Sequence, residues 1–344
     1  MAIVLIHVGL DYHDDTVRVC VLAEDGAVLF NRDLDNDVAA VVRAVARFGV
    51  PRGVAIEACC GAANFAAEMI RLTGWKVRLG HPGYVKRLKQ GPDKTDHDDA
   101  WLLADLDRVN YLPEVWLADE TTLQLRRLVT YREGLKKERK NVKLRIRALL
   151  REERIPLPVE KAWTKPWKEW VRKVSLPEQS RWVMDQLLEQ LTRLEADLRA
   201  VENRMEQATA DDPLTQRLLA EPGIGPITAV ALRAEIGRFD RFRTAKQLSK
   251  YCGVTPCNAS SGKRQADAGL IKAGSRELRA LLIQTAKRLP RQDPHFQEMK
   301  NRLGRTKKAN VVTCAIANRW LRRLYHRMLA PQCSPGNETV PTAA

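Results

Sequence analysis

Apolar residues gather in short runs along the first part of the chain, and these runs predict β-strands. Residues 3–10 and 16–23 are β-type runs rich in Val, Ile and Leu. An acidic, glycine-ending turn at 24–26 leads into a third run over 28–32. We therefore expect the chain to begin with three hairpin-connected antiparallel strands.

Helical and strand-like patterns alternate after this meander. We predict helices over 36–48, 64–72, 84–89 and 96–109, and strands over 53–57 and 76–79. Three hairpin-joined strands followed by alternating helices and strands are typical of a ribonuclease-H-like α/β domain. In such a sheet Asp11, on the first strand, and Glu57, at the end of the fourth, would be neighbours.

The pattern changes after residue 120 to long stretches with near-heptad spacing of leucine and other apolar residues. A basic helix is expected over 121–153, and a second helix over 178–208, with a proline-containing break and a Trp-rich segment between them. The two helices predict a helical hairpin or coiled coil. They could pack together within one chain, or one could pair with another protomer.

A mostly helical region follows to residue 329. Its Pro-Gly-Ile-Gly string at 222–225 is similar to the turn of a helix-hairpin-helix element, where glycines let the backbone approach a phosphate. A tight turn with a purely structural role fits the same residues. We thus divide the chain into domains over 1–119, 120–210 and 211–330, with a tail over 331–344 that we expect to be disordered.

Charge is distributed unevenly along the chain. The 344 residues contain 58 Lys and Arg against 42 Asp and Glu. Residues 1–119 hold 13 basic and 18 acidic residues, whereas residues 241–330 hold 21 basic and only 4 acidic ones. A solvated surface usually mixes the two signs. The asymmetry therefore predicts that the end of the chain binds a nucleic acid.

Cysteine usage and hydropathy indicate an intracellular protein. The seven cysteines show no disulfide framework and no zinc-ligand spacing, so we expect reduced thiols. No apolar run reaches the roughly 20 residues of a membrane span, and the amino end lacks a basic leader. We predict a cytoplasmic protein that does not contact the membrane.

Four carboxylates are the candidate metal ligands. Asp11 and Glu57 end apolar, strand-like runs, and Asp96 and Asp99 are three residues apart on one face of a predicted helix. Each has an ordinary structural explanation, since Asp96, for example, suits a helix N-cap. Together, however, four oxygen donors would bind hard divalent cations, and a pair of such ions can clamp a phosphodiester.

A glycine-bounded polar loop over 253–264 carries a second candidate site. The loop contains Ser260 and Ser261, followed by Lys263 and Arg264. It could simply bind phosphate through a basic, glycine-rich backbone. Alternatively, a serine could attack phosphorus while the cations neutralise the transition state, although no His or Asp lies nearby in sequence to activate it. Further basic residues follow at spacings that suit the same phosphate surface: Lys272, Arg276 and Arg279.

Several short motifs, in consistent order over about residues 3–329, resemble the DEDD transposases of bacterial insertion sequences, the bridge-RNA-guided recombinases. The most specific is Lys-Thr-Asp-x-x-Asp-Ala at 94–100. The others are Gly-Leu-Asp at 9–11, Ile-Glu-Ala-Cys at 56–59, Pro-Gly-Ile-Gly-Pro at 222–226, Ser-Ser-Gly at 260–262 and Lys-Ala-Gly at 272–274. Two cations common in relatives are replaced here by Asp14 and His97, which puts phosphate contact near the metal site in question.

The resemblance implies a RuvC-like first domain, a coiled-coil connector and a C-terminal transposase domain. It also implies Mg²⁺ held by Asp11, Glu57, Asp96 and Asp99, and a nucleophilic Ser261, with Ser260 as the fallback. The implied partners are donor and target DNA, a structured guide RNA, and further copies of the chain in a dimer or tetramer.

Three functions follow as hypotheses. The chain is a transposase that exchanges DNA strands through a serine–DNA intermediate, or a RuvC-like junction-resolving nuclease that uses metal-activated water and merely binds phosphate through Ser261. In the third, it binds nucleic acid without catalysis.

Overall fold

The computed structural model describes residues 4–88, 96–159, 162–258, 267–271 and 273–330. The chain divides into two compact units, Met1–Asp119 and Glu120–Ala344. The predicted tail 331–344 lies outside the described residues, as do the sequence-predicted site residues Ser260, Ser261, Lys263, Arg264 and Lys272.

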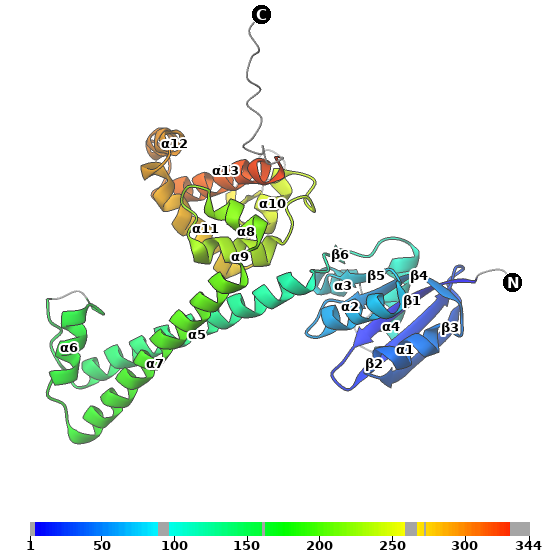
Figure 1. Cartoon of the computed structure of the whole chain (residues 1–344), viewed down its shortest axis with the longest axis horizontal. Helices are drawn as coiled ribbons and strands as arrows, with labels where there is room; N and C mark the ends of the chain where they lie inside the picture. The colour runs from blue at the N-terminus through cyan, green and yellow to red at the C-terminus, as the bar shows by residue number, and fades with distance from the viewer. Residues whose placement is uncertain (1–3, 89–95, 160–161, 259–266, 272, 331–344) are drawn as a thin grey trace, which may run out of the picture. The chain divides into compact units, whose positions relative to one another are not determined.

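A six-stranded mixed sheet forms the centre of the first unit (Figure 1). Its order is β3-β2-β1-β4-β5-β6. Strands β1, β4 and β5 are parallel, and β2, β3 and β6 are each antiparallel to their neighbours. The strands span Leu5–Tyr12 (β1), Thr16–Ala23 (β2), Val28–Asp35 (β3), Val50–Glu57 (β4), Val77–Gly80 (β5) and Glu114–Val115 (β6).

Helices cover both faces of this sheet. They are α1 (Val38–Val45), α2 (Ala62–Thr73), α3 (Pro82–Leu88) and α4 (Asp96–Arg108). Alternate residues of each strand point to opposite faces. Ile6, Val8 and Leu10 of β1 pack with α1 and α2 in one apolar cluster. On the other face, Cys20 and Leu22 of β2 pack against Ala100 and Ala104 of α4. The odd-numbered residues of β1 therefore face α4.

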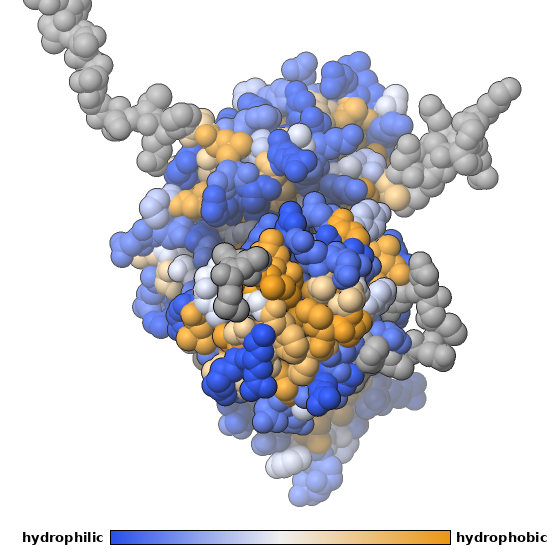
Figure 2. Space-filling view, turned by 90° about the vertical axis from the view of Figure 1, so that its right-hand side faces the viewer, coloured by the Kyte–Doolittle hydropathy of each residue, from blue (hydrophilic) through white to orange (hydrophobic). Residues whose placement is uncertain are grey.

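The edge of the sheet where β1, β3 and β4 begin exposes apolar side chains. Figure 2 shows apolar side chains gathered at this end of the first unit. At this edge Val4 directly precedes β1, Val28 begins β3 and Val50 begins β4, and each is about half-exposed. The opposite edge, where β1 and β4 end, carries Asp11 and Glu57 instead.

The second unit begins with a long antiparallel helical hairpin. Helix α5 (Glu120–Glu152) packs along α7 (Glu178–Ala208), and α6 (Lys165–Lys173) lies near the turn between them (Figure 1). Arg132 of α5 pairs with Glu202 of α7 at 2.6 Å. The two long helices thus pair within one chain, which settles one alternative left open by the sequence.

Heptad-like spacing explains this pairing. The buried residues of α7 recur every three or four positions, so they form one stripe that faces α5. They are Met184, Leu188, Leu191, Leu194, Leu198, Val201 and Met205.

A mainly helical bundle completes the second unit, with its own apolar core. Its elements are α8 (Pro213–Leu219), α9 (Pro226–Ile236), α10 (Ala245–Tyr251), β7 (Pro256–Asn258), β8 (Asp267–Leu270), α11 (Arg276–Arg288), η1 (Leu289–Arg291), α12 (Pro294–Gly304) and α13 (Ala309–Leu329). An α/β first unit and a mainly helical remainder agree with the predicted fold class. None of the helices that the structure describes is long and apolar enough to cross a membrane.

The Pro-Gly-Ile-Gly string forms the tight turn between α8 and α9. Gly223 has φ +83°, and a Cβ there would lie 3.2 Å from both Leu289 Cδ2 and Gln292 Oε1. This side of the turn therefore packs against protein, which supports the structural role. A Cβ on Gly225 would meet nothing within 4 Å, so that side of the turn is open.

Candidate functional site

Two of the predicted ligands end adjacent parallel strands. Leu10 of β1 pairs with Ile56 of β4, so Asp11 and Glu57 follow at the same level of the sheet. Both continue the odd-numbered face of their strands, the face covered by α4. They are neither fully buried nor fully exposed, and the Asp11 side chain is 14% exposed. Two acidic side chains therefore lie side by side at the carboxyl edge of the sheet.

Helix α4 crosses this face against β1 and runs in the opposite direction. A Cβ on Gly9 would lie only 2.0 Å from the Ala100 carbonyl oxygen and 2.5 Å from the Ala104 nitrogen. Further down, Asp107 near the end of α4 meets His7, two residues before Gly9. The amino end of α4 therefore extends past Gly9 toward the strand ends that carry Asp11 and Glu57.

This placement brings the start of α4, which holds Asp96 and Asp99, to the same edge. Asp99 directly precedes Ala100, and its side chain is buried, with 7% exposed. Asp96 is the first residue of α4, but its side chain, like that of His97, lies outside the description. Asp14, Asp15 and Asp98, the other acidic residues beside the candidates in sequence, are exposed.

The donor set suits a hard divalent cation, because carboxylate oxygens are the ligands that Mg²⁺ prefers. Within the described part of the chain, however, no three His, Cys, Asp or Glu side chains are arranged closely enough to hold a metal ion. Asp11, Glu57 and the start of α4 therefore share one edge of the sheet, but the described side chains at this edge do not form such a group.

The electrostatics of this edge are those of neighbouring acidic groups. His13 Nε2 lies 3.2 Å from Asp11 Oδ2. Partial burial raises the pKa of the Cys59 thiol, and the negative charges of Glu57 and Asp11 raise it further. Cys59 is therefore held in its neutral thiol form beside the carboxylates.

A buried polar cluster that the sequence did not predict anchors α4. Asp107, only 3% exposed, accepts a hydrogen bond of 2.9 Å from Arg78 Nε on β5, and its other oxygen lies 2.7 Å from His7 Nδ1 on β1. Gly53 of β4 leaves room for it, because a Cβ there would lie 2.4 Å from the Asp107 carboxyl oxygens. The cluster joins three strands to the far end of α4, and so fixes where its amino end lies.

The second candidate locus is the β7–β8 hairpin. Pro256 pairs with Leu270 and Asn258 with Asp267, so the two strands flank the serine-containing loop. The loop residues Ser260, Ser261, Lys263 and Arg264 themselves lie outside the described residues. The sequence pattern predicted a polar loop here and did not predict the short strands, which are too brief to show an alternating pattern.

Two of the predicted basic residues lie on α11 beside this hairpin. Arg276 is the exposed first residue of the helix. Arg279 is half-buried, and its guanidinium carbon lies 3.2 Å from the position of a Cβ on Gly253, which precedes β7. A Cβ on Gly274 would lie 2.1 Å from the Tyr251 carbonyl oxygen, so the chain before α11 packs tightly on the end of α10. Arg279 is thereby held at the base of the hairpin.

Both units match models of known protein families. Residues 8–154 match a family described as transposase, and residues 215–301 match the transposase IS116/IS110/IS902 family.

Curated relatives are similar over most of the chain. A probable family 20 transposase of Pseudomonas aeruginosa is 32% identical, and the match covers 96% of this chain and 98% of the relative. The transposase for insertion sequence element IS1328 of Yersinia enterocolitica is 30% identical over 78% of this chain and 81% of its own length. The transposase for IS1111A of Coxiella burnetii is 26% identical over 82% of this chain and 77% of its own length.

Proposed function

The chain belongs to the IS116/IS110/IS902 transposase family, and we propose that it cuts and rejoins DNA strands in an Mg²⁺-dependent reaction guided by a bound RNA. Transposases cleave DNA and transfer its strands, so the chain is an enzyme whose substrate is DNA. The observation that carries the proposal is the meeting of Asp11, Glu57 and the amino end of α4 at one edge of the sheet.

In this proposal the first unit is a RuvC-like domain over 1–119. The order β3-β2-β1-β4-β5, with three antiparallel strands followed by parallel ones, supports a ribonuclease-H-like topology. The connector spans 120–210 and the transposase domain 211–330.

Asp11, Glu57, Asp96 and Asp99 would hold the metal ions. A bound Mg²⁺ would neutralise charge on the phosphate under attack and on the oxygen that leaves. The His7–Asp107–Arg78 cluster then acts as a positioning group, because it fixes α4 and with it the last two ligands.

Ser261 would supply the nucleophile, with Ser260 as the alternative. Its Oγ forms a bond to phosphorus while the bond from phosphorus to one deoxyribose oxygen breaks, and the serine proton ends on that oxygen. The hydroxyl group of a second strand later displaces the serine, which regains a proton. Lys263, Arg264, Lys272, Arg276 and Arg279 would contact the phosphates around this step.

The remaining partners are a structured guide RNA and other copies of the chain. RNA pairing would select donor and target DNA, in a dimer or tetramer that acts in the cytoplasm. A discrete RNA that co-purifies with the protein expressed from its native locus would support the guide; purification without any such RNA would contradict it.

Replacing the proposed nucleophile tests the chemistry directly. We expect the wild-type protein, with Mg²⁺ and its RNA, to form a protein–DNA adduct that survives denaturing electrophoresis. Ser261→Ala should abolish both the adduct and cleavage. The matched control Ser260→Ala, one residue away, should retain both.

The same experiment separates the alternative functions. A water-using nuclease is the stronger alternative, because the carboxylate edge lies in a unit of its own; it predicts cleavage without an adduct, unaffected by Ser261→Ala. Asp11→Asn should abolish cleavage in either case. A protein that only binds nucleic acid would cleave nothing and would bind DNA unchanged after Asp11→Asn.

A further inference from the structure

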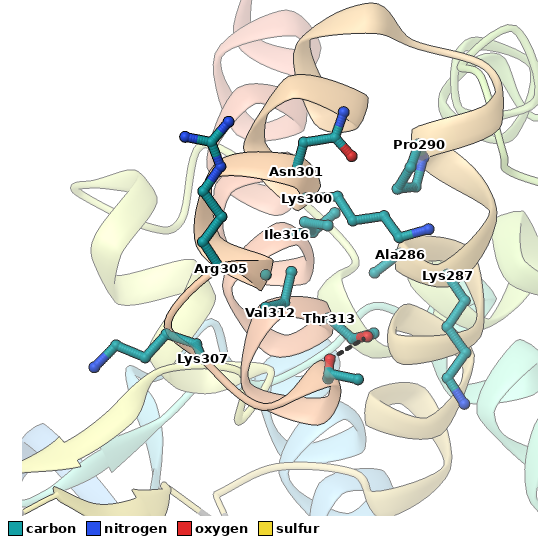
Figure 3. A pocket seen from close by; sticks show the side chains of 12 residues that line it. Ala286, Lys287, Pro290, Lys300, Asn301, Arg305, Lys307, Val312, Thr313 and Ile316 are labelled. Carbon is teal, nitrogen blue, oxygen red and sulfur yellow. Dashed lines mark hydrogen bonds between the residues drawn. The ribbon is translucent and has the colours of Figure 1, made fainter.

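A cavity of about 550 Å³ opens between α11, α12 and the start of α13 (Figure 3). Its size lies within the range of about 300–1,000 Å³ that is typical of small-molecule sites. It is separate from the carboxylate edge and is not lined by the β7–β8 hairpin. The sequence patterns did not single it out, because its lining comes from three segments.

The floor of the cavity is apolar. Ala286 of α11 and Val312 and Ile316 of α13 are buried core residues that close its base. Pro290 of η1 extends this apolar surface at one side. A ligand that fills the cavity therefore needs an apolar or flat aromatic part as well as charge.

The rim is cationic and comes from three different segments. Lys287 lies on α11, Lys300 on α12, and Arg305 and Lys307 on the connection to α13. In Figure 3 Lys300 extends from α12 toward the side of the cavity formed by α11. No Asp or Glu lines the cavity, and none of these four cations forms an ion pair with any residue that the structure describes. In the same view the charged ends of Lys287, Arg305 and Lys307 point away from the cavity, so Lys300 is the cation that reaches over it and the other three are placed to meet phosphates that flank a bound group.

Two neutral polar side chains also line the cavity. Asn301 offers an amide N–H₂ donor and a carbonyl acceptor, the pair that matches the edge of a nucleobase. The Thr313 hydroxyl donates to the Ala309 carbonyl oxygen at 2.9 Å, so its own oxygen can still accept a hydrogen bond.

We propose that this cavity binds one unstacked nucleotide of a single-stranded nucleic acid, with its base on the apolar floor and the flanking phosphates on the cationic rim. A base within a duplex is paired and stacked, so an unpaired strand can insert one at a much lower cost in free energy. The inference rests on the proposed function only in that the chain handles separated nucleic-acid strands. DNA and RNA share the required chemistry, and the test distinguishes them.

The test measures binding of fluorescent single-stranded and duplex oligonucleotides to the full-length protein. Lys300→Glu reverses one rim charge, and Thr313→Trp fills the cavity without changing any charge. We expect each to weaken single-strand binding by about tenfold, the scale of losing one stacked or buried base, and to weaken duplex binding much less. The matched control Arg302→Glu changes the charge at an exposed position of α12 outside the lining, and it should weaken binding less than about twofold.

The outcomes separate this site from simpler explanations. Equal losses in Arg302→Glu and Lys300→Glu would overturn the proposal, since the surface would then act only through its general charge. Unchanged binding in Thr313→Trp would also overturn it. Ala309→Phe is a second filling variant for use if Thr313→Trp unfolds, as judged by circular dichroism. Competition by inorganic phosphate alone, at the concentration where a nucleoside monophosphate competes, would indicate a small-anion site and contradict a nucleotide site.

Parallel series with DNA and RNA oligonucleotides of the same sequence identify the strand. A larger loss for RNA assigns the cavity to the guide, and a larger loss for DNA assigns it to a separated substrate strand. The binding series is run without Mg²⁺, so its result does not depend on strand cleavage. Failure of the serine mechanism and failure of this site are thus distinguishable.

Discussion

Adding a single methyl group at Gly9 should displace the helix that carries two of the four proposed ligands. In Gly9→Ala the new Cβ would lie 2.0 Å from the Ala100 carbonyl oxygen, where ordinary contacts begin at 3.4 Å. The Ala104 nitrogen would lie 2.5 Å away. Both atoms belong to the backbone of α4, so no side-chain rotation can relieve the overlap. Helix α4 must therefore move away from β1 by more than an ångström, or the sheet must deform.

The two consequences of this shift differ in size. Overpacking of this kind costs about 1–3 kcal/mol of unfolding free energy. A misplacement of about 1 Å at a reacting centre can cost about a hundredfold in rate, because it spoils the geometry of groups that must act together. We therefore expect Gly9→Ala to lower stability moderately and DNA cleavage severely.

Urea denaturation and Mg²⁺-dependent cleavage, measured on the same preparations, check this expectation. The matched control is Gly134→Ala in α5, where a Cβ meets nothing within 4 Å. It should gain about 0.5–1 kcal/mol, as alanine does over glycine inside a helix, and should cleave normally. Wild-type stability in Gly9→Ala would show that α4 does not pack as described. Loss of stability with full cleavage would show that the position of α4 does not matter for the reaction.

Two further predictions concern the second unit. Burial alone would raise the pKa of Asp212, but hydrogen bonds from the Thr215 N–H and the Arg233 guanidinium outweigh it and hold the pKa below its ordinary range. A carboxyl group whose pKa is lower in the folded protein adds stability at pH values above its pKa in the unfolded chain, and this stability is lost as the pH falls through the folded-state pKa. Asp212→Asn should therefore flatten the decline of the urea midpoint below about pH 4. An unchanged decline would contradict this. Arg279→Ala should weaken DNA binding and reduce the slope of log Kd against log[salt] by about one, whereas an unchanged slope would remove it from the phosphate contacts.

Long-period patterns in the sequence predicted the helices well. The helix expected over 178–208 spans Glu178–Ala208, and that expected over 121–153 spans Glu120–Glu152. Their apolar stripes recur over many turns, so local periodicity alone defines them. Which stripe pairs with which could not be predicted, because intrachain and interchain pairing bury the same faces.

Short elements that depend on distant partners were predicted less well. Strand β4 begins at Val50, three residues before its expected start, because Leu5 of β1 pairs there. Strand β3 continues to Asp35 through polar residues, since Arg18 of β2 pairs with Asp33 at 2.8 Å. In both cases a neighbouring strand extends the ladder beyond the apolar run that the sequence displays.

The candidate carboxylates could be proposed from residue type and order, but their support could not. Asp107 has the same acidic character in sequence as Asp105, which is less buried, and His7 sits in an apolar run that resembles any buried strand. Only the crossing of α4 over β1 brings the two within 2.7 Å. The cavity beside α12 was missed for the same reason, since its cations come from three separate segments.

The uneven charge of the chain has a direct consequence for how DNA can reach the carboxylates. Residues 1–119 carry five more acidic than basic residues, and the proposed ligands repel phosphates unless cations neutralise them. Much of the free energy of DNA binding should therefore come from residues 241–330, with 21 basic residues against 4 acidic. Since salt weakens these contacts, raising ionic strength should raise the DNA concentration needed for cleavage more than it slows cleavage at saturation.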